Sequence, residues 1–172
     1  MAKIDTSRWK NFRITDLFDI VKGSRLTRAD MVEGDTRYIG AVLFGNGITN
    51  HIANDENIHP AGTLTVVYNG AATAKTFYQD EPFWATDDIN VLYPKFKMNL
   101  MTGLFLATVI ERYGHDKYGW YDKWKLEYMS EDSICIPCAD DGTPDWEYMD
   151  AYMRNELGKA EVSLDNLAAV VA

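Results

Sequence analysis

The chain has 172 residues, of which 47% are apolar and 13% aromatic, a composition typical of one folded domain. No stretch approaches the roughly 20 apolar residues of a membrane-spanning helix, and residues 1–5 lack the apolar core of a signal peptide, so we expect a cytoplasmic protein. The net charge of −9 argues against nucleic-acid binding, but residues 1–128 carry 15 basic and 16 acidic side chains, whereas residues 129–172 carry 2 and 10. The acidity therefore lies in the tail, and the body is free to present a basic face.

Residues 9–30 predict an extended segment, a short helix and a basic turn. Thr15 suits the N-cap of the short helix. Thr27 and Asp30 have the spacing of a capping box for one further helical turn. Basic side chains around a glycine suit contact with phosphate, and they equally suit a solvated turn. The candidate phosphate contacts here are Lys22, Arg25 and Arg28.

Residues 37–51 predict a strand followed by a polar turn. The sequence RYIGAVL at 37–43 favours a strand, and the turn at 44–51 contains two glycines and two asparagines. The carboxamides of Asn46 and Asn50 suit the edge of an adenine base, whereas asparagine also tolerates the positive φ of turns. Both interpretations stay open at this point.

Residues 62–93 are the stretch around which we expect the rest of the chain to be organised. Short runs of β-branched and aromatic residues alternate with turns, and Asn69-Gly70 is a strong turn dipeptide. A three-stranded meander is the natural product of this pattern. Its predicted strands are 63–68, 76–78 and 89–93.

The loop at 69–75 combines a carboxamide, a glycine, small side chains and one lysine. Such a loop approaches a surface closely, so Asn69, Thr73 and Lys75 are candidate DNA contacts; the alternative is a solvated hairpin tip. The loop also resembles a phosphate-cradling loop ending in Lys-Thr. That motif requires glycine where this chain has Asn69 and Ala74, and it requires a following helix, so we reject nucleotide binding.

The clearest helix before the tail is predicted at 98–113, with Gly114 as its terminator. Its apolar stripe comprises Met101, Leu104, Phe105, Thr108 and Val109. Residues 115–125 then interleave lysines with aromatic rings, a mixture that suits contact with phosphate and with sugar or base. A partly buried aromatic loop with solvated lysines is the alternative. The candidate DNA contacts in this segment are Lys117, Tyr118, Tyr121 and Lys123.

Cys135 and Cys138 form a C-x-x-C pair. A zinc site needs four ligands, and the three histidines are not spaced as a second ligand pair. A thioredoxin-like motif passes directly into a helix, whereas an acidic turn follows here. We therefore expect ordinary residues of a strand at 133–137, with no metal site.

After the turn at 140–144, apolar residues at three- and four-residue spacing predict an acidic amphipathic helix, with Pro144 near its first position. Gly158 is a candidate for a bend or an interruption. An amphipathic helix at a chain end packs on its own domain or mates with another helix, so its stripe is a candidate partner-binding surface. The stripe comprises Trp146, Met149, Met153 and Leu157.

The order of these segments resembles the target recognition domain of the DNA specificity (S) subunits of type I restriction-modification systems and of their type IIB relatives. The likeness spans residues 9–153. It rests on FRITDLFDIVKGSRLT, RYIGA, NGITN, TVVYNG, FYQDEPFWATDDINVLYPK and IPCADDGTPDWEYM. The resemblance implies a mixed α/β (α+β) fold, with a twisted, mainly antiparallel sheet and packed helices. A recognition domain at 1–142 would precede a helical dimerisation and docking segment at 143–172.

The resemblance also implies a function. A domain of this kind reads one half of a bipartite target in double-stranded DNA, docks methyltransferase and restriction subunits, and pairs its C-terminal helix with that of a second copy. It has no catalysis or cofactor of its own, because S-adenosylmethionine, ATP and magnesium belong to partner subunits. Residues 71–75 replace the Ser-x-Gly run frequent in the family, so no target sequence carries over.

The residues themselves also argue against an enzyme. The chain has no Asn-Pro-Pro-Tyr or Asp-Pro-Pro-Tyr methyltransferase signature and no glycine-rich turn for a cofactor. Pro144-Asp145 is not followed by a Glu-x-Lys nuclease pair. The rival to DNA recognition is a protein-interaction module that docks restriction-modification subunits without reading DNA, and the acidic tail is its best support.

Overall fold

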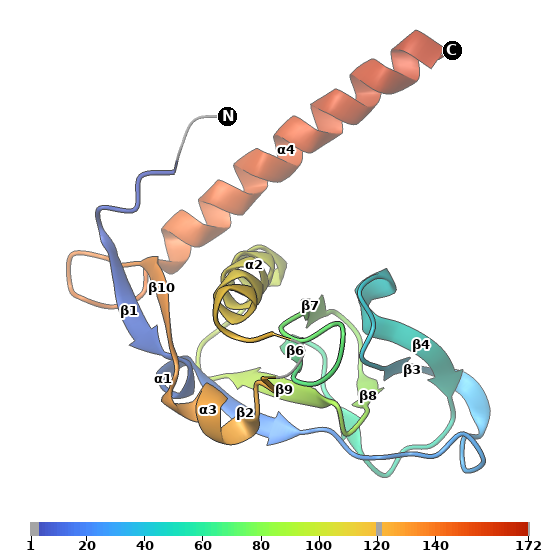
Figure 1. Ribbon diagram of the computed structural model, residues 1–172. Helices are drawn as coiled ribbons and strands as arrows, with labels where there is room; N and C mark the ends of the chain where they lie inside the picture. The colour runs from blue at the N-terminus through green and yellow to red at the C-terminus, as the bar shows by residue number, and fades with distance from the viewer. Residues whose placement is uncertain (1–3, 120–121, 172) are drawn as a thin grey trace.

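A four-stranded antiparallel sheet forms the centre of the molecule (Figure 1). The computed structural model describes residues 4–119 and 122–171. In spatial order the strands are β2 (Phe18–Lys22), β9 (Ile89–Pro94), β6 (Thr63–Val67) and β7 (Thr76–Gln79). Because side chains alternate between the two faces of a strand, Leu64 and Val66 of β6 lie on one face and Val67 lies on the other. All of β6 is buried, so both faces of this central sheet are covered.

A second four-stranded sheet covers the Val67 face. Its strands, in the order β4-β3-β8-β5, are β4 (Ile48–Ile52), β3 (Glu33–Ile39), β8 (Phe83–Ala85) and β5 (Ile58–His59). The β3–β8 pair is parallel, and the other pairs are antiparallel. Ile39 and Phe83 share a hydrophobic cluster with Val67 and Val91 of the central sheet. The fold is therefore mixed α/β and mainly antiparallel, as predicted.

Residues 62–93 do not form the predicted meander, because the third strand does not pair with the second. β6 and β7 form the expected hairpin, with Thr63 opposite Gln79 and Val66 opposite Thr76. The chain then leaves the central sheet, contributes β8 to the second sheet and returns as β9 on the other side of β6. The short apolar run at β8 pairs with β3, so β9 does not lie beside β7.

Helix α2 (Leu100–Lys117) covers the other face of the central sheet, where Leu106 and Ile110 are fully buried beside Leu64. The buried side of α2 is centred on Phe105, Leu106 and Ile110, so the predicted stripe is correct only in part. The helix does not end at Gly114, as predicted, but continues to Lys117. Gly114 lies inside the helix at a point where the chain packs closely against it. A Cβ there would lie 2.5 Å from the Ala74 Cβ.

A small two-stranded sheet joins the beginning of the chain to the region before the last helix. β1 (Trp9–Arg13) pairs with β10 (Ser133–Pro137), and the short helices α1 (Ile14–Leu17) and α3 (Leu126–Glu131) lie beside it. Arg13, not Thr15, is the N-cap of α1, and its side chain makes no capping bond. Residues 27–30 form a single hydrogen-bonded turn in place of the predicted helical turn.

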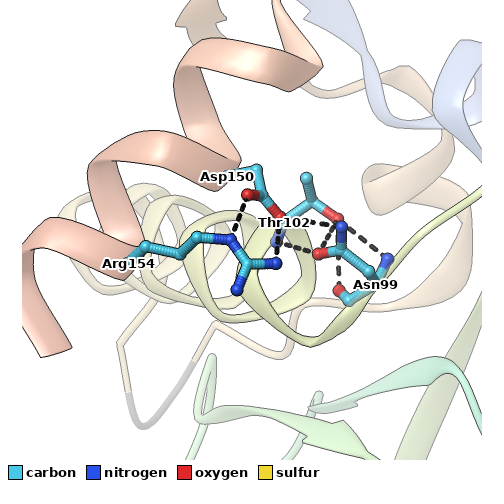
Figure 2. Close-up of polar contacts among 4 residues, drawn as sticks. All are labelled: Asn99, Thr102, Asp150 and Arg154. Carbon is cyan, nitrogen blue, oxygen red and sulfur yellow. Dashed lines mark hydrogen bonds and ion pairs between the residues drawn. The ribbon is translucent and has the colours of Figure 1, made fainter.

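Helix α4 (Trp146–Val171) is one continuous helix that projects beyond the body, with α2 lying between it and the central sheet (Figure 1). The interruption predicted at Gly158 does not occur. Figure 2 shows how the start of α4 is attached: Asn99 caps α2 and donates from Nδ2 to Asp150 Oδ1 at 2.8 Å. Arg154 Nε donates to Asp150 Oδ2 at 2.6 Å.

The start of α4 also shares the core of the body. Met149 is fully buried in the cluster that contains Phe105 and Leu106. The boundary between 142 and 143 stays a prediction, but residues on both sides of it pack together. Within the described ranges, no helix is both long enough and apolar enough to cross a membrane.

Two glycine-to-alanine substitutions should change stability in opposite directions. Gly114→Ala should lower the free energy of unfolding by about 1–3 kcal/mol, because the added methyl would overlap Ala74 and Trp124. Gly158→Ala in α4 meets nothing within 4 Å and should stabilise by about 0.5–1 kcal/mol, because alanine favours helix. Urea unfolding of both variants measures these changes. A stabilising Gly114→Ala would contradict the described packing.

Candidate nucleic-acid interface

Three of the four segments predicted to contact DNA meet at one end of the central sheet, hereafter the loop end. Paired residues form a row across the four strands at this end: Lys22, Asn90, Val66 and Thr76. Segment 22–28 therefore leaves β2 at this end, and segment 69–75 connects β6 to β7 there. The close contact between Gly114 and Ala74 also brings the end of α2, and with it segment 115–125, to the same place.

Trp124 anchors the last of these segments to the sheet. Its ring is fully buried, its backbone N–H donates to the Tyr68 carbonyl at 3.0 Å, and its carbonyl accepts from Asn90 Nδ2 at 3.5 Å. The two neighbouring side chains, Lys123 and Lys125, are exposed. The buried ring thus fixes the positions from which two lysines extend.

These lysines face a third one across a cleft of about 220 Å³, hereafter the lysine cleft. It is lined by Lys22, Tyr68, Asn90, Lys123, Lys125 and Glu127, among others. The Lys22 Nζ lies 5.2 Å from the centroid of the Tyr68 ring. In the part of the chain that the structure describes, none of the three lysines forms an ion pair. The cleft is therefore a site of concentrated positive charge.

A buried carboxylate, that of Asp132, links the end of α2 to Trp124. Asp132 is 5% exposed and accepts from Tyr113 Oη at 2.9 Å and from the Lys117 ammonium through Oδ1. Its Oδ2 accepts from Tyr118 Oη at 2.7 Å and from Trp124 Nε1 at 2.8 Å. Four donors from the end of α2 and from the following segment thus converge on one side chain.

The protonation of this cluster follows from its contacts. Burial opposes ionisation of Asp132, but the hydrogen bonds from its four donors outweigh burial and lower the pKa of the carboxyl. Burial and the adjacent carboxylate together raise the pKa of Tyr118 to about 12. The hydrogen bond to Asp132 raises the pKa of Lys117. At neutral pH the cluster is an ionised carboxylate among protonated donors.

Of the other predicted DNA contacts at the loop end, two have acidic neighbours within the chain and one is exposed. Asn69 Nδ2 donates to Asp88 Oδ1 at 2.9 Å, and Arg25 lies 3.8 Å from Asp87. Arg28 is exposed in the turn beyond them. Carboxylates therefore share this surface with the basic residues.

Several predicted contacts already have partners within the chain. Thr73 is 5% exposed and donates to the Gly70 carbonyl at 2.7 Å. Lys75 Nζ lies 2.9 Å from Glu111 Oε1. Lys117 and Tyr118 are held by Asp132, as described above. The prediction for Tyr121 falls outside the described residues.

The fourth predicted segment, 44–51, does not lie at the loop end. Asn46 has a φ of 55° and exchanges hydrogen bonds with Gln79: its Nδ2 donates to Gln79 Oε1 at 3.3 Å, and Gln79 Nε2 donates to its carbonyl at 3.1 Å. Gln79 is at the opposite end of β7 from Thr76. Asn50 is exposed on β4. Segment 44–51 therefore lies apart from the three segments that meet at the loop end.

The predicted partner-binding stripe of α4 mostly faces the body of the same chain. Trp146 stacks on Phe96 with ring centroids 3.9 Å apart, and Met149 is fully buried. Met153 is partly buried against the same core, and Leu157 is 36% exposed. Docking of a partner by these four residues stays a prediction. The stripe first of all attaches the helix to its own domain.

Three residues of this region were not predicted from the sequence. Tyr68 and Lys125 line the lysine cleft, and Asp132 holds the segment beside it. Lysine alternation through 117–125 was the available signal for Lys125. The acidic pair Glu131-Asp132 before a strand gives no such signal, because the partners of Asp132 lie up to 19 residues away in the sequence.

Neither the cysteines nor the acidic residues form a metal centre in the described ranges, where no group of three or more His, Cys, Asp or Glu side chains is placed to hold an ion. Cys135 is exposed on β10, and Cys138 is buried just after it; both are free.

The chain combines a mixed α/β body, a lysine-lined end and a long projecting helix. The chain belongs to the type I restriction modification DNA specificity domain family, whose family model matches residues 6–163. The specificity subunit S.BcgI of a type II restriction enzyme from Heyndrickxia coagulans is 34% identical over 151 residues. That match covers 88% of this chain and 44% of the relative.

Solved structures show the same fold at low sequence identity. The S subunit of a type I restriction-modification system from M. genitalium superposes with a TM-score of 0.61 at 16% identity, covering 95% of this chain and 44% of that one. The HsdS subunit from Thermoanaerobacter tengcongensis gives 0.64 at 14% identity, with 96% and 41% covered. A type I system described for its complex assembly gives 0.66 at 14% identity, with 99% and 43% covered. The chain thus spans less than half the length of each.

Removing the buried carboxylate should destabilise the domain in a pH-dependent way. Asp132→Asn should lower the free energy of unfolding at pH 7 by roughly 2–4 kcal/mol, because Lys117 loses its ionised partner and the buried donors lose acceptors. The adjacent exposed Glu131→Gln is the control and should cost less than about 0.5 kcal/mol.

The pH dependence follows from the lowered pKa of Asp132. Because the unfolded carboxyl, with its ordinary value of 3.8, takes up a proton before the folded one, the stabilisation is complete above about pH 4 and is lost as pH falls through the folded-state pKa. Denaturant unfolding from pH 7 to pH 3 measures this difference. A gap between wild type and Asp132→Asn that persists unchanged to pH 3 would contradict it.

Proposed function

We propose that this chain reads one half of a bipartite target in double-stranded DNA, as the specificity subunit or half subunit of a restriction-modification complex. The observation that carries the proposal is the convergence of segments 22–28, 69–75 and 115–125 at the loop end, in a chain of the specificity domain family. Lysines there suit phosphate, and carboxamide and tyrosine groups suit base edges. Loops on a rigid sheet are a common basis of recognition.

The charge distribution supports this role. The three lysines of the lysine cleft make no ion pair among the described residues, whereas Lys75 and Lys117 are neutralised by carboxylates within the chain. DNA contact through this surface therefore rests on a few free cations, so the salt dependence of binding should be modest. The outer part of α4, which carries Glu161 and Asp165, projects beyond the body (Figure 1).

Reading a bipartite target requires a second recognition domain. The chain spans 44% of its curated relative and contains one such domain. The second domain comes either from a second copy of this chain, which would give a palindromic bipartite target, or from the rest of a longer protein. Pairing of two α4 helices is the proposed means of joining two copies.

The outer part of α4 has the properties of a docking surface. Val162, Leu164 and Leu167 are 61%, 65% and 63% exposed, although helices of monomeric proteins normally bury their apolar residues. At 1.5 Å per residue, this helix of 26 residues is about 39 Å long, enough to present one part to the body and another to a partner. We propose that methyltransferase subunits, a second copy and, in complete systems, restriction subunits share this surface.

We further propose that the chain has no catalysis of its own and acts in the cytoplasm. S-adenosylmethionine, ATP and magnesium would then be bound by the partner subunits. The lysine cleft at the loop end is lined by Lys22, Lys123 and Lys125, residues suited to holding a polyanion.

The DNA-reading proposal is tested by selection from randomised duplexes with the chain reconstituted with a methyltransferase subunit. We expect enrichment of a short fixed sequence, and of its inverted repeat at a fixed spacing if two copies assemble. A complex that forms in a pull-down but enriches no sequence would support docking without DNA reading. The methyltransferase subunit alone is the control.

Self-association is tested by Leu164→Glu combined with Leu167→Glu. If α4 pairs with a second copy, sedimentation should show a concentration-dependent dimer for the wild-type chain and a monomer for this variant. Ala151→Glu, an exposed position on the attached part of the helix, is the matched control and should remain dimeric. A wild-type chain that remains monomeric at high concentration would contradict pairing.

A further inference from the structure

We infer that the lysine cleft binds a phosphate group and that, within the proposed function, it holds a phosphodiester of the DNA backbone. The inference rests on the proposed function for the source of that phosphate. It goes further in naming one site and one ligand group, and it assigns roles to Lys125 and Tyr68 as well as to Lys22 and Lys123.

The lysine cleft concentrates positive charge. Lys22 comes from the end of β2, and Lys123 and Lys125 come from a segment 100 residues later, yet all three line one cleft. Like charges brought together repel one another, and a protein surface tolerates this arrangement best when an anion neutralises it. Glu127 also lines the cleft but forms no ion pair with these lysines among the described contacts. The cleft therefore keeps a net positive charge.

The backbone between Lys123 and Lys125 is held in place by Trp124. The backbone of Trp124 is bound to Tyr68 and Asn90, its ring is fully buried, and its Nε1 donates to Asp132. Lys125 N–H also donates to the Lys123 carbonyl at 2.8 Å, which closes a tight turn around the buried residue. The lysine side chains thus extend from fixed backbone positions. A site prepared before binding pays less ordering entropy.

The shape and size of the lysine cleft suit a phosphodiester. The ring of Tyr68 lies beneath Lys22, so a flat apolar surface adjoins the positive charge. A phosphodiester presents this combination, because its charged oxygens are joined to apolar sugar faces. The volume of about 220 Å³ is below the roughly 300 Å³ at which pockets for whole small molecules begin. One phosphate with part of its sugar fits this volume.

The same chemistry could come from a free phosphate or a mononucleotide, and the surroundings favour the backbone. Asn69 and Arg25 lie at the same end of the sheet, so a strand held in the cleft could continue across them. A mononucleotide site would need a second set of groups for the base, and the cleft lining supplies only Asn90 and Glu127 for that purpose.

The test compares the reconstituted complex with three single variants, their triple combination and one control variant. Lys22→Gln, Lys123→Gln and Lys125→Gln should each lower affinity for duplex by about 3- to 10-fold, equally for target and unrelated sequences. The triple variant should reduce the slope of log affinity against log salt by about 1, the value for one lost phosphate contact. Lys97→Gln is the control, because Lys97 is exposed beyond the opposite end of β9 and should have no effect.

A second arm identifies the ligand. Duplexes carrying a single neutral methylphosphonate at successive positions should include one that weakens the wild-type complex as much as the triple substitution does. The triple variant should be insensitive to that same position. If the triple variant instead binds all duplexes like Lys97→Gln, with an unchanged salt slope, the inference is overturned while the proposed function stands.

The two failures can be told apart. If the complex binds no duplex even at low salt, the proposed function fails. Inorganic phosphate and a deoxynucleoside monophosphate are then titrated into the chain alone, with the amide and ring signals of Tyr68 and Trp124 followed by NMR. Saturable shifts that are absent from the triple variant would support phosphate binding from a free source. No shift with either probe would overturn the inference as well.

Discussion

The carboxylate of Asp132 is the contact on which the loop end depends. It lies at the start of β10, and its four donors come from the last turn of α2 and from the segment that follows. Ionised and buried, it is stabilised by those donors, and its two oxygens in turn hold them together. These contacts fix Trp124, which lies between Lys123 and Lys125 of the lysine cleft.

The route of the chain through two sheets has a functional consequence. Because β8 joins the second sheet, β9 returns beside β2 and not beside β7. This order places Lys22 next to Asn90 across one strand pair and brings the end of β6 within reach of Trp124. In a simple meander, β9 would lie beside β7 instead. The basic surface is thus a product of strand order as much as of composition.

Helix α4 divides its two tasks along its length. Its first turns bury Met149, and Asp150 accepts a hydrogen bond from Asn99 at the start of α2 and another from Arg154 within α4 (Figure 2). The contacts of Met149 and Asn99 set the direction in which the helix leaves the body. Its outer turns expose Leu164 and Leu167. The same apolar periodicity therefore continues from a part of the helix that the chain itself covers to a part that is exposed. Periodicity alone does not distinguish them, because it reports a face and not what covers the face.

The sequence by itself determined the β6–β7 hairpin, the strand at β10 and the two long helices, because each depends on local periodicity or turn chemistry. The mixed α/β class followed from the resemblance to the family. It also identified Lys22 and Lys123 as candidate contacts. Only the tertiary structure decided the order of the strands, the separation of segment 44–51 from the loop end, and the passage of α2 through Gly114. Only the fold, too, decided which lysines are free and which are paired. These outcomes depend on contacts between residues far apart in the chain, and no local pattern encodes which distant carboxylate or strand edge a given segment will meet.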